Sequence, residues 1–545
     1  MTSTPSPGIP HSPLQSEKSR RYDRQLRLWG DHGQNALEYA SICMINASAI
    51  GTEILKSLVL PGVGSFTILD QHKLTAEDAG NNFFLDPECI GQSRGEVAMR
   101  LLLELNHEVR GDCVQQSVEQ VLEMKRDFFS SFSLVVCCGL PERSLLNLAK
   151  ILWTENIPLV TVKTAGFLGY MRLQVREHFI VETHPDSRTP DLRLENPWPE
   201  LETWLQNQVD KLESMTRQEH SHTPYPVLLY RYLNEWRAEH NNDIPQNYKE
   251  KTQFKENIRK GLLRREGNEE FEEDEENFEE ACKAVNTVIK LSSIPSNTMT
   301  ILQDPCASNL HSGAESFWLI AHAVGRFVDL ENRLPVEGLL PDMFSDSARY
   351  VELHNIYRER ANQDAESIYK YIVQFLESNN RSRDVVSEAD VRRFCRESRY
   401  LRLERGCSLE AEYTGGGSST SLQNGLEDPD SDALYYLVLR AVDRYISEYG
   451  STPGDTDPEV EADTAKLKTI FTRLCIEAGL TPPQGQDDHI HEVCRYGGSE
   501  LHTVAAFLGG CAAHECIKLL TGQYVPIDNI VVYNAITSNV STFKV

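Results

Sequence analysis

The sequence predicts an α/β protein with a doubly wound, mostly parallel sheet that is interrupted by a large, mainly helical insertion. Two observations lead to this fold class. Short apolar strand-like stretches alternate with helix-like segments over residues 20–178, and residues 491–545 return to the same pattern. Between them, residues 179–490 are charged, helical in periodicity and punctuated by Pro, as a separate insertion would be.

The first elements form a strand–helix–strand unit. Residues 42–45 are continuously apolar, as buried parallel strands are, and a helix follows from about Gly51. Pro61 and Gly62 end this helix, because glycine readily adopts the left-handed conformation of a C-cap. The second strand, 65–69, ends at Asp70. Such a unit predicts a parallel sheet.

Further elements continue the alternation along the chain. Helices are expected at 95–105, 145–153 and 504–520, and strands at 134–138, 157–162 and 529–533. The segment 414–432, rich in Gly and Ser, predicts a flexible, exposed loop. The acidic run 269–280 is either a solvated helix anchored by Phe271 and Phe278 or a docking face for a basic partner.

Bulk properties limit the functional classes. The net charge of −27 disfavours nucleic acid and anionic membranes as partners and favours protein interfaces. None of the 13 cysteines forms the C-x-x-C pairs of structural zinc sites, so we expect no bound metal. Residues 1–19 predict a disordered tail without the apolar segment of a signal peptide, and the longest apolar stretch, 504–513, is too short for a membrane span. We therefore expect a cytoplasmic protein, with the nucleus as a second compartment.

The turn after the first strand determines whether the domain binds a nucleotide. A phosphate-binding turn needs glycines, because only they let backbone N–H groups approach phosphate closely. Here Asn46 and Ser48 replace the first two, and only Gly51, which allows helix and strand to pack, remains. Asp70 stands where an acid would bind a ribose hydroxyl, but Asp also commonly ends strands. We interpret this as a degenerate nucleotide site.

Several motifs resemble the ubiquitin-activating enzyme superfamily, which has a ThiF/MoeB-like adenylation fold. These are YDRQLRLWG at 22–30, GVGSFTILD at 62–70 and HTVAAFLGG at 502–510. The resemblance extends from residue 21 to residue 545 and narrows to the regulatory subunits of neddylation-activating enzymes. The narrower motifs are EDAGNNFF at 77–84, HSHTP at 220–224, DEENFEE at 274–280, LPDM at 340–343 and LRAVDR at 439–444.

The resemblance implies that catalytic groups are missing. Active members hold the triphosphate with an Arg and a Lys and magnesium with an Asp. The matching positions are Asn81, Arg94 and Pro141. Proline offers no cation ligand, whereas Arg94 keeps a positive charge. No cofactor is therefore expected in this chain, and ATP and magnesium are expected in a partner subunit.

Two features imply a role toward that partner. In related dimers, the arginine that matches Arg24 reaches across the interface to the partner's ATP, a role that suits a permanently charged guanidinium. The alternative for Arg24 is an intramolecular salt bridge near Asp23 or Asp31. The segment 335–350 resembles a partner-contacting stretch, and an ordinary Pro-bounded loop is the alternative. Its expected contact residues are Pro335, Leu340, Pro341, Asp342 and Met343.

The insertion resembles the family's catalytic-cysteine domain without the cysteine. None of its cysteines lies in a nucleophile motif; they are Cys282, Cys306, Cys395, Cys407 and Cys475. The implied function is a non-catalytic, regulatory subunit. Its catalytic partner adenylates a ubiquitin-like modifier, which passes as a thioester to a conjugating enzyme for neddylation of cullins.

Three alternatives compete with this interpretation. A self-sufficient adenylating enzyme would need the glycine-rich loop, the metal Asp and usually C-x-x-C pairs. A nicotinamide- or flavin-dependent oxidoreductase would need the same loop. The sister regulatory subunit of the sumoylation pathway is similar in sequence style but lacks so large an insertion.

Overall fold

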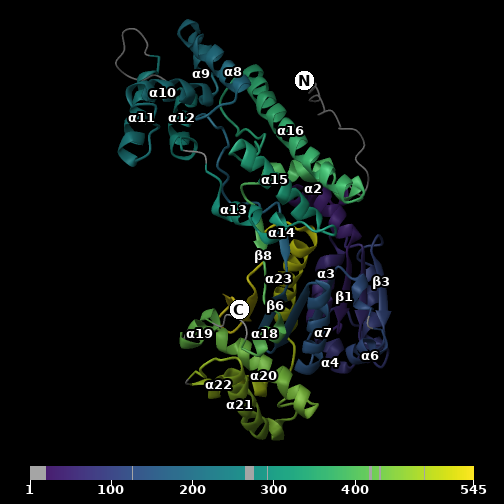
Figure 1. Cartoon of the computed structure of the whole chain (residues 1–545). Coiled ribbons are helices and arrows are strands. Elements are labelled where there is room, and N and C mark those ends of the chain that lie inside the picture. The colour runs from purple at the N-terminus through teal and green to yellow at the C-terminus, as the bar shows by residue number, and fades with distance from the viewer. Residues whose placement is uncertain are drawn as a thin grey trace, which may run out of the picture. The chain divides into compact units, whose positions relative to one another are not determined.

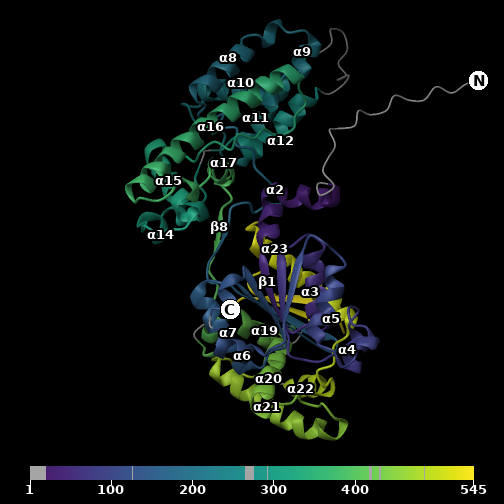
Figure 2. The ribbon, with the colours of Figure 1, turned by 90° about the vertical axis from the view of Figure 1, so that its right-hand side faces the viewer.

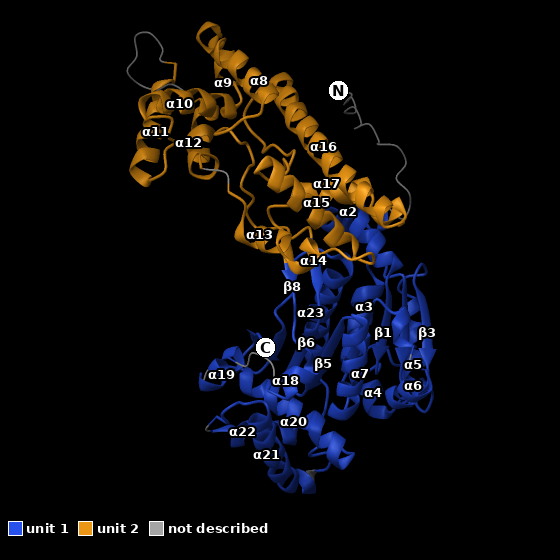
Figure 3. Cartoon of the chain, in the orientation of Figure 1, with its two compact units in different colours: residues 1–180, 403–545 blue, residues 181–402 orange. Residues whose placement is uncertain are grey.

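The computed structural model describes residues 20–125, 127–263, 275–290, 293–415, 420–428, 431–483 and 485–545. They form two compact units (Figure 3). Unit 1 contains the residues up to Ile180 together with Leu403–Val545, and unit 2 is Val181–Arg402. The chain leaves and re-enters unit 1 through strands β7 (His178–Ile180) and β8 (Arg402–Glu404), which pair in a two-stranded sheet.

Unit 1 is built on an eight-stranded sheet with the order β10-β9-β6-β5-β4-β1-β2-β3 (Figure 1). The strands from β3 to β5 are parallel, and β6, β9 and β10 are antiparallel to their neighbours. The predicted fold class, a mostly parallel doubly wound sheet, is confirmed. The strands are β1 (Ser41–Ile45), β2 (Ser65–Leu69), β3 (Arg110–Val114), β4 (Leu134–Cys138), β5 (Leu159–Ala165), β6 (Leu168–Gln174), β9 (Ile530–Asn534) and β10 (Asn539–Phe543).

The central strands are apolar throughout because helices cover both of their faces. In β1, Met44 packs into the cluster under one face, whereas Cys43 packs into the cluster under the other. Figure 2 shows α3 (Ala49–Val59) and α5 (Arg94–Leu103) on one side of β1 and α7 (Glu142–Glu155) on the other. The long helix α23 (His502–Thr521) packs on α3 and shares its core cluster.

Other helices of unit 1 complete these layers. They are α2 (Asp23–Tyr39), α4 (Ala76–Asn81), α6 (Val118–Met124), α18 (Leu409–Tyr413), α19 (Thr420–Glu427), α20 (Ala433–Tyr449), α21 (Val460–Glu477) and α22 (Gln486–Arg495). The group α19–α22 forms a hydrophobic cluster with β6, β9 and β10. It therefore covers the antiparallel end of the sheet.

The division of the chain differs from the expected insertion of residues 179–490. Its beginning lies close to the start of unit 2, but residues 403–490 pack within unit 1. The physical reason is visible at α20, where Asp443 forms a buried ion pair with Lys163 of β5. Helical periodicity marks these residues as helices, but it does not say which sheet they cover.

Predicted elements agree in position more often than in length. The strands at 65–69 and 134–138 are found with those bounds, whereas the helix at 145–153 extends to Glu142–Glu155. The strand expected at 529–533 is β9, and a further strand that was not predicted, β10, follows it. The loop expected at 414–432 contains α19, whose Leu422 and Leu426 are buried; residues 416–419 and 429–430 lie outside the described residues.

Unit 2 is helical. Its helices are α8 (Pro199–Val209), α9 (Arg217–Ser221), α10 (Tyr225–Glu239), α11 (Tyr248–Lys260), α12 (Glu276–Val288), α13 (Ser296–Leu302), α14 (Pro305–Ser308), α15 (Ser316–Glu331), α16 (Ser347–Ser378) and α17 (Glu388–Glu397). Phe278, from the acidic run, is buried and stacks on His220 with ring centroids 5.3 Å apart. The expected second anchor, Phe271, lies outside the described residues.

Among the described helices, α23 is long and apolar enough to cross a membrane. The apolar stretch predicted from the sequence, 504–513, was therefore too short. Ala505, Leu508 and Ala512 of this helix are buried in the core beneath the sheet. Because α23 packs its apolar side against α3, we interpret it as a core helix of unit 1.

Candidate functional site

The turn between β1 and α3 lies at the carboxyl end of the parallel strands, where doubly wound sheets hold their ligands. Asn46 has a positive φ of 68°, a conformation that Asn tolerates better than most residues. Its side-chain amide donates a hydrogen bond to the Cys138 backbone oxygen at 2.8 Å. A Cβ at Gly51 would lie 2.5 Å from the Asn46 backbone oxygen, so close packing of helix and strand requires glycine there.

The backbone donors of this turn are occupied by carboxylates of the chain itself. Ala47 N–H donates to Asp70 Oδ2 at 2.9 Å, and Ala49 N–H donates to Glu500 Oε2 at 3.0 Å. The Ser48 hydroxyl lies 3.5 Å from Glu500 Oε1. In phosphate-binding turns these are the groups that point at the anion. Here they already have intramolecular acceptors.

Asp70 and Arg94, the expected ribose and phosphate positions, neutralise each other. Arg94 Nε donates to Asp70 Oδ2 at 2.8 Å, and its terminal nitrogen donates to Asp78 at 3.0 Å. Burial acts to raise the pKa of Asp70, but the hydrogen bond from His72 and the charge of Arg94 outweigh it and lower the pKa to about 2. Asp70 is therefore ionised and paired, and the charge of Arg94 is compensated by two carboxylates.

The other two expected positions carry no charge. The Asn81 amide donates to the Glu500 backbone oxygen at 3.3 Å, and Pro141 is the N-cap residue of α7. Within the described ranges, no group of three or more His, Cys, Asp or Glu side chains is placed to hold a metal ion. The geometry at these positions offers neither a phosphate clamp nor a cation ligand.

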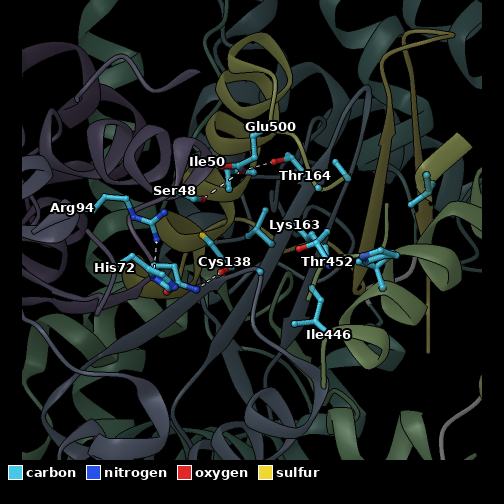
Figure 4. A pocket seen from close by; sticks show the side chains of 18 residues that line it. Ser48, Ile50, His72, Arg94, Cys138, Lys163, Thr164, Ile446, Thr452 and Glu500 are labelled. Atoms are coloured by element: carbon cyan, nitrogen blue, oxygen red, sulfur yellow. Dashed lines mark hydrogen bonds between the residues drawn. The ribbon is translucent and has the colours of Figure 1, made fainter. Parts of the chain in front are cut away.

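A cavity of about 320 Å³ remains beside the turn (Figure 4). Ser48, Arg94 and Glu500 line one part of it, and Lys163 and Thr164 of β5 another. Lys163 is paired with the buried Asp443, which also accepts a hydrogen bond from the Tyr170 hydroxyl at 3.1 Å. Glu500, Lys163 and Thr164 were not among the predicted site residues, because no local motif marks them.

Arg24 lies in the first turn of α2, and its side chain is 89% exposed. Among the described residues, one carboxylate pairs with it, that of Asp23 at 4.0 Å, which is at the limit of an ion pair. Asp23 lies closer to Arg27, at 3.2 Å. The salt bridge to Asp23, one of the alternatives for Arg24, is thus a marginal contact, and the guanidinium faces solvent.

The expected partner-contacting residues in unit 2 differ in accessibility. Pro335 is buried, and its backbone oxygen accepts a hydrogen bond from Arg193 at 3.0 Å. Leu340 and Met343 are half-buried against the core of unit 2. Asp342 is exposed, and Pro341 is half-buried. Of the five residues, Pro335 is therefore the least accessible to a partner.

The five cysteines of the predicted insertion, residues 179–490, also differ in exposure. Cys282, Cys395 and Cys475 are buried, and burial raises the pKa of each thiol, that of Cys475 to about 11. Burial also raises the pKa of the half-buried Cys407, whereas Cys306 is exposed. A raised pKa lowers the thiolate fraction that a nucleophile needs. Four of the five candidates are thus unsuited to thioester chemistry.

Comparison with known proteins shows which family the chain belongs to. A sequence profile of the ThiF family matches residues 22–545. The chain is 46% identical to the NEDD8-activating enzyme E1 regulatory subunit of Xenopus laevis, over 97% of this chain and 98% of that protein. It is 36% identical to regulatory subunit AXR1 of Arabidopsis thaliana, over 97% and 96%, and 27% identical to the regulatory subunit of Saccharomyces cerevisiae, over 96% and 100%. The chain therefore belongs to the ThiF family and, within it, to the family of NEDD8-activating enzyme E1 regulatory subunits.

Proposed function

We propose that this chain is the non-catalytic subunit of a heterodimeric enzyme that activates the ubiquitin-like protein NEDD8. One observation carries the proposal. In a chain similar over nearly its whole length to regulatory subunits, the backbone donors of the nucleotide turn are bound by the chain's own Asp70 and Glu500. An enzyme that adenylates by itself would need those donors for phosphate.

The partner subunit, in this proposal, binds ATP and magnesium and forms the adenylate and the thioester. The present chain binds the partner, helps to shape the surface for NEDD8 and the conjugating enzyme, and acts in the cytoplasm and nucleus. Its direct contribution to the reaction is Arg24. An exposed guanidinium can bind phosphate oxygens in a bidentate manner, and fixed positive charge stabilises the charge that develops during adenylate formation.

The test is ATP–pyrophosphate exchange in the presence of NEDD8 and magnesium. We expect no exchange by the purified chain and full exchange when the catalytic subunit is added in equal amount. The catalytic subunit alone is the matched control and should exchange slowly. Rapid exchange by the isolated chain would overturn the proposal, because a chain without a phosphate turn could not catalyse it.

A further inference from the structure

Glu500 lies where two segments distant in the chain meet the nucleotide turn. Its backbone forms an isolated parallel bridge with Gly166, and the Gly166 N–H donates to the neighbouring Ser499 oxygen at 2.7 Å. Asn81 of α4 donates to the Glu500 backbone oxygen. The backbone on both sides of the side chain is therefore held in place, which directs the carboxylate toward α3.

The Glu500 carboxylate has three donors from two elements. Oε1 accepts from the Thr164 hydroxyl at 2.6 Å and lies 3.5 Å from the Ser48 hydroxyl, and Oε2 accepts from the Ala49 N–H at 3.0 Å. Figure 4 shows Glu500 between Ser48 and Thr164 at the cavity. Ser48 is the N-cap residue of α3 but makes no side-chain capping bond of its own. Glu500 thus caps the helix from a distant part of the chain.

A negative group at this position has two physical consequences. It interacts favourably with the positive end of an 11-residue helix. It also repels any other anion that approaches the same donors. The two nearby cations do not compensate an added anion, since Arg94 is paired with Asp70 and Asp78 and Lys163 with Asp443.

We propose that Glu500 is an autoinhibitory internal ligand, which occupies the phosphate position at the start of α3 and keeps the cavity closed to nucleotides and other polyphosphate anions. The Ala49 N–H and the hydroxyls of Ser48 and Thr164 are donors beside the cavity, and the Glu500 carboxylate takes all three. The inference rests on the proposed function in one respect, that the native chain takes up no nucleotide there.

The test uses the purified full-length chain and magnesium-free sodium pyrophosphate, with binding measured by calorimetry at constant ionic strength. The wild-type chain should show no binding up to millimolar concentrations. Glu500→Ala should bind pyrophosphate at least about tenfold more tightly than the wild type, because the repelling charge is gone and the donors are free. Glu500→Gln keeps the size of the side chain and should bind more weakly than Glu500→Ala but better than the wild type.

Two control variants separate this site from a general effect. Thr164→Val removes one donor but leaves the carboxylate in place, so it should bind no pyrophosphate. Glu250→Ala removes a carboxylate from the N-terminal turn of α11, where it accepts from the Gln246 N–H, and should also bind none. Circular dichroism establishes that each variant is folded, and Glu500→Gln serves if Glu500→Ala is not.

The outcomes are distinguishable. Absence of binding by both folded Glu500 variants would overturn the autoinhibitory role while leaving the proposed function intact. Equal binding by Glu250→Ala would overturn it as well, since the loss of a carboxylate from any helix N-terminal turn would then suffice. Binding of pyrophosphate by the wild-type chain would contradict both this inference and the proposed function.

Discussion

The buried ion pair between Lys163 and Asp443 joins α20 to the sheet of unit 1. Removing one partner should lower the free energy of unfolding of unit 1 and expose α20 more often. Both residues are at most 8% exposed, and the Asp443 carboxylate also accepts from the Tyr170 hydroxyl. Burial raises the pKa of Asp443, and the charge of Lys163 offsets this only in part. Lys163→Met leaves the buried carboxylate without its paired cation, which costs about 3–5 kcal/mol.

Labelling of buried thiols measures this loss unit by unit. Cys475 of α21 is fully buried in unit 1, and Cys395 is buried in unit 2. Since 1.4 kcal/mol is a factor of ten, the single variant should raise the labelling rate of Cys475 by about 100-fold or more. The rate at Cys395 should stay unchanged. The effect should be smaller at pH 5 than at pH 8, because protonation of Asp443 removes the uncompensated charge.

The double variant Lys163→Met with Asp443→Asn provides the decisive comparison. Removing both charges should recover at least about 2 kcal/mol relative to the sum of the single variants. If the double variant is as unstable as that sum, or if Lys163→Met leaves Cys475 protected, the ion pair does not hold α20 on the sheet.

Two further predictions concern Arg24 and Glu337. In the assembled pair, Arg24→Ala should slow adenylation by about tenfold or more, as measured by pyrophosphate exchange. The control Arg27→Ala, on the same exposed turn, should leave the rate unchanged. Equal rates for the two variants would mean that Arg24 makes no contact with ATP. Burial and the charge of Asp191 raise the pKa of Glu337 to about 7 despite the charge of Arg399. The wild type should therefore lose stability as the pH rises from about 4.3, the pKa of Glu in the unfolded chain, through 7. Glu337→Gln should therefore stabilise unit 2 by about 2–3 kcal/mol at pH 8 and by little at pH 5 in urea titrations; a pH-independent difference would contradict the buried-carboxylate explanation.

Local patterns predicted the parallel half of unit 1 well. Residue type and spacing predict the strands β1, β2 and β4 and the helix before Gly62. Each of these elements is buried where its own sequence is apolar. The sequence also shows Asn46 and Ser48 where a phosphate-binding turn would have glycines, since the requirement for glycine there is local.

Contacts between distant segments could not be predicted in this way. Glu500 lies 452 residues from Ser48, and neither position carries a periodicity that links them. The placement of α20 depends in the same manner on Asp443 meeting Lys163, 280 residues away. A single sequence reports the propensity of each segment, whereas these pairings depend on the folded arrangement of both partners.

In the proposed function, this chain contributes Arg24 to a reaction whose nucleotide occupies the partner's site, and it binds no ATP in a site of its own. The most direct measurement is the stoichiometry of ATP binding to the assembled pair, obtained by equilibrium dialysis with magnesium and without NEDD8. The occupied turn at Ala47 and Ala49 predicts one ATP per heterodimer. Two ATP molecules per heterodimer would contradict it, because the second could be held only by the site that Asp70 and Glu500 fill.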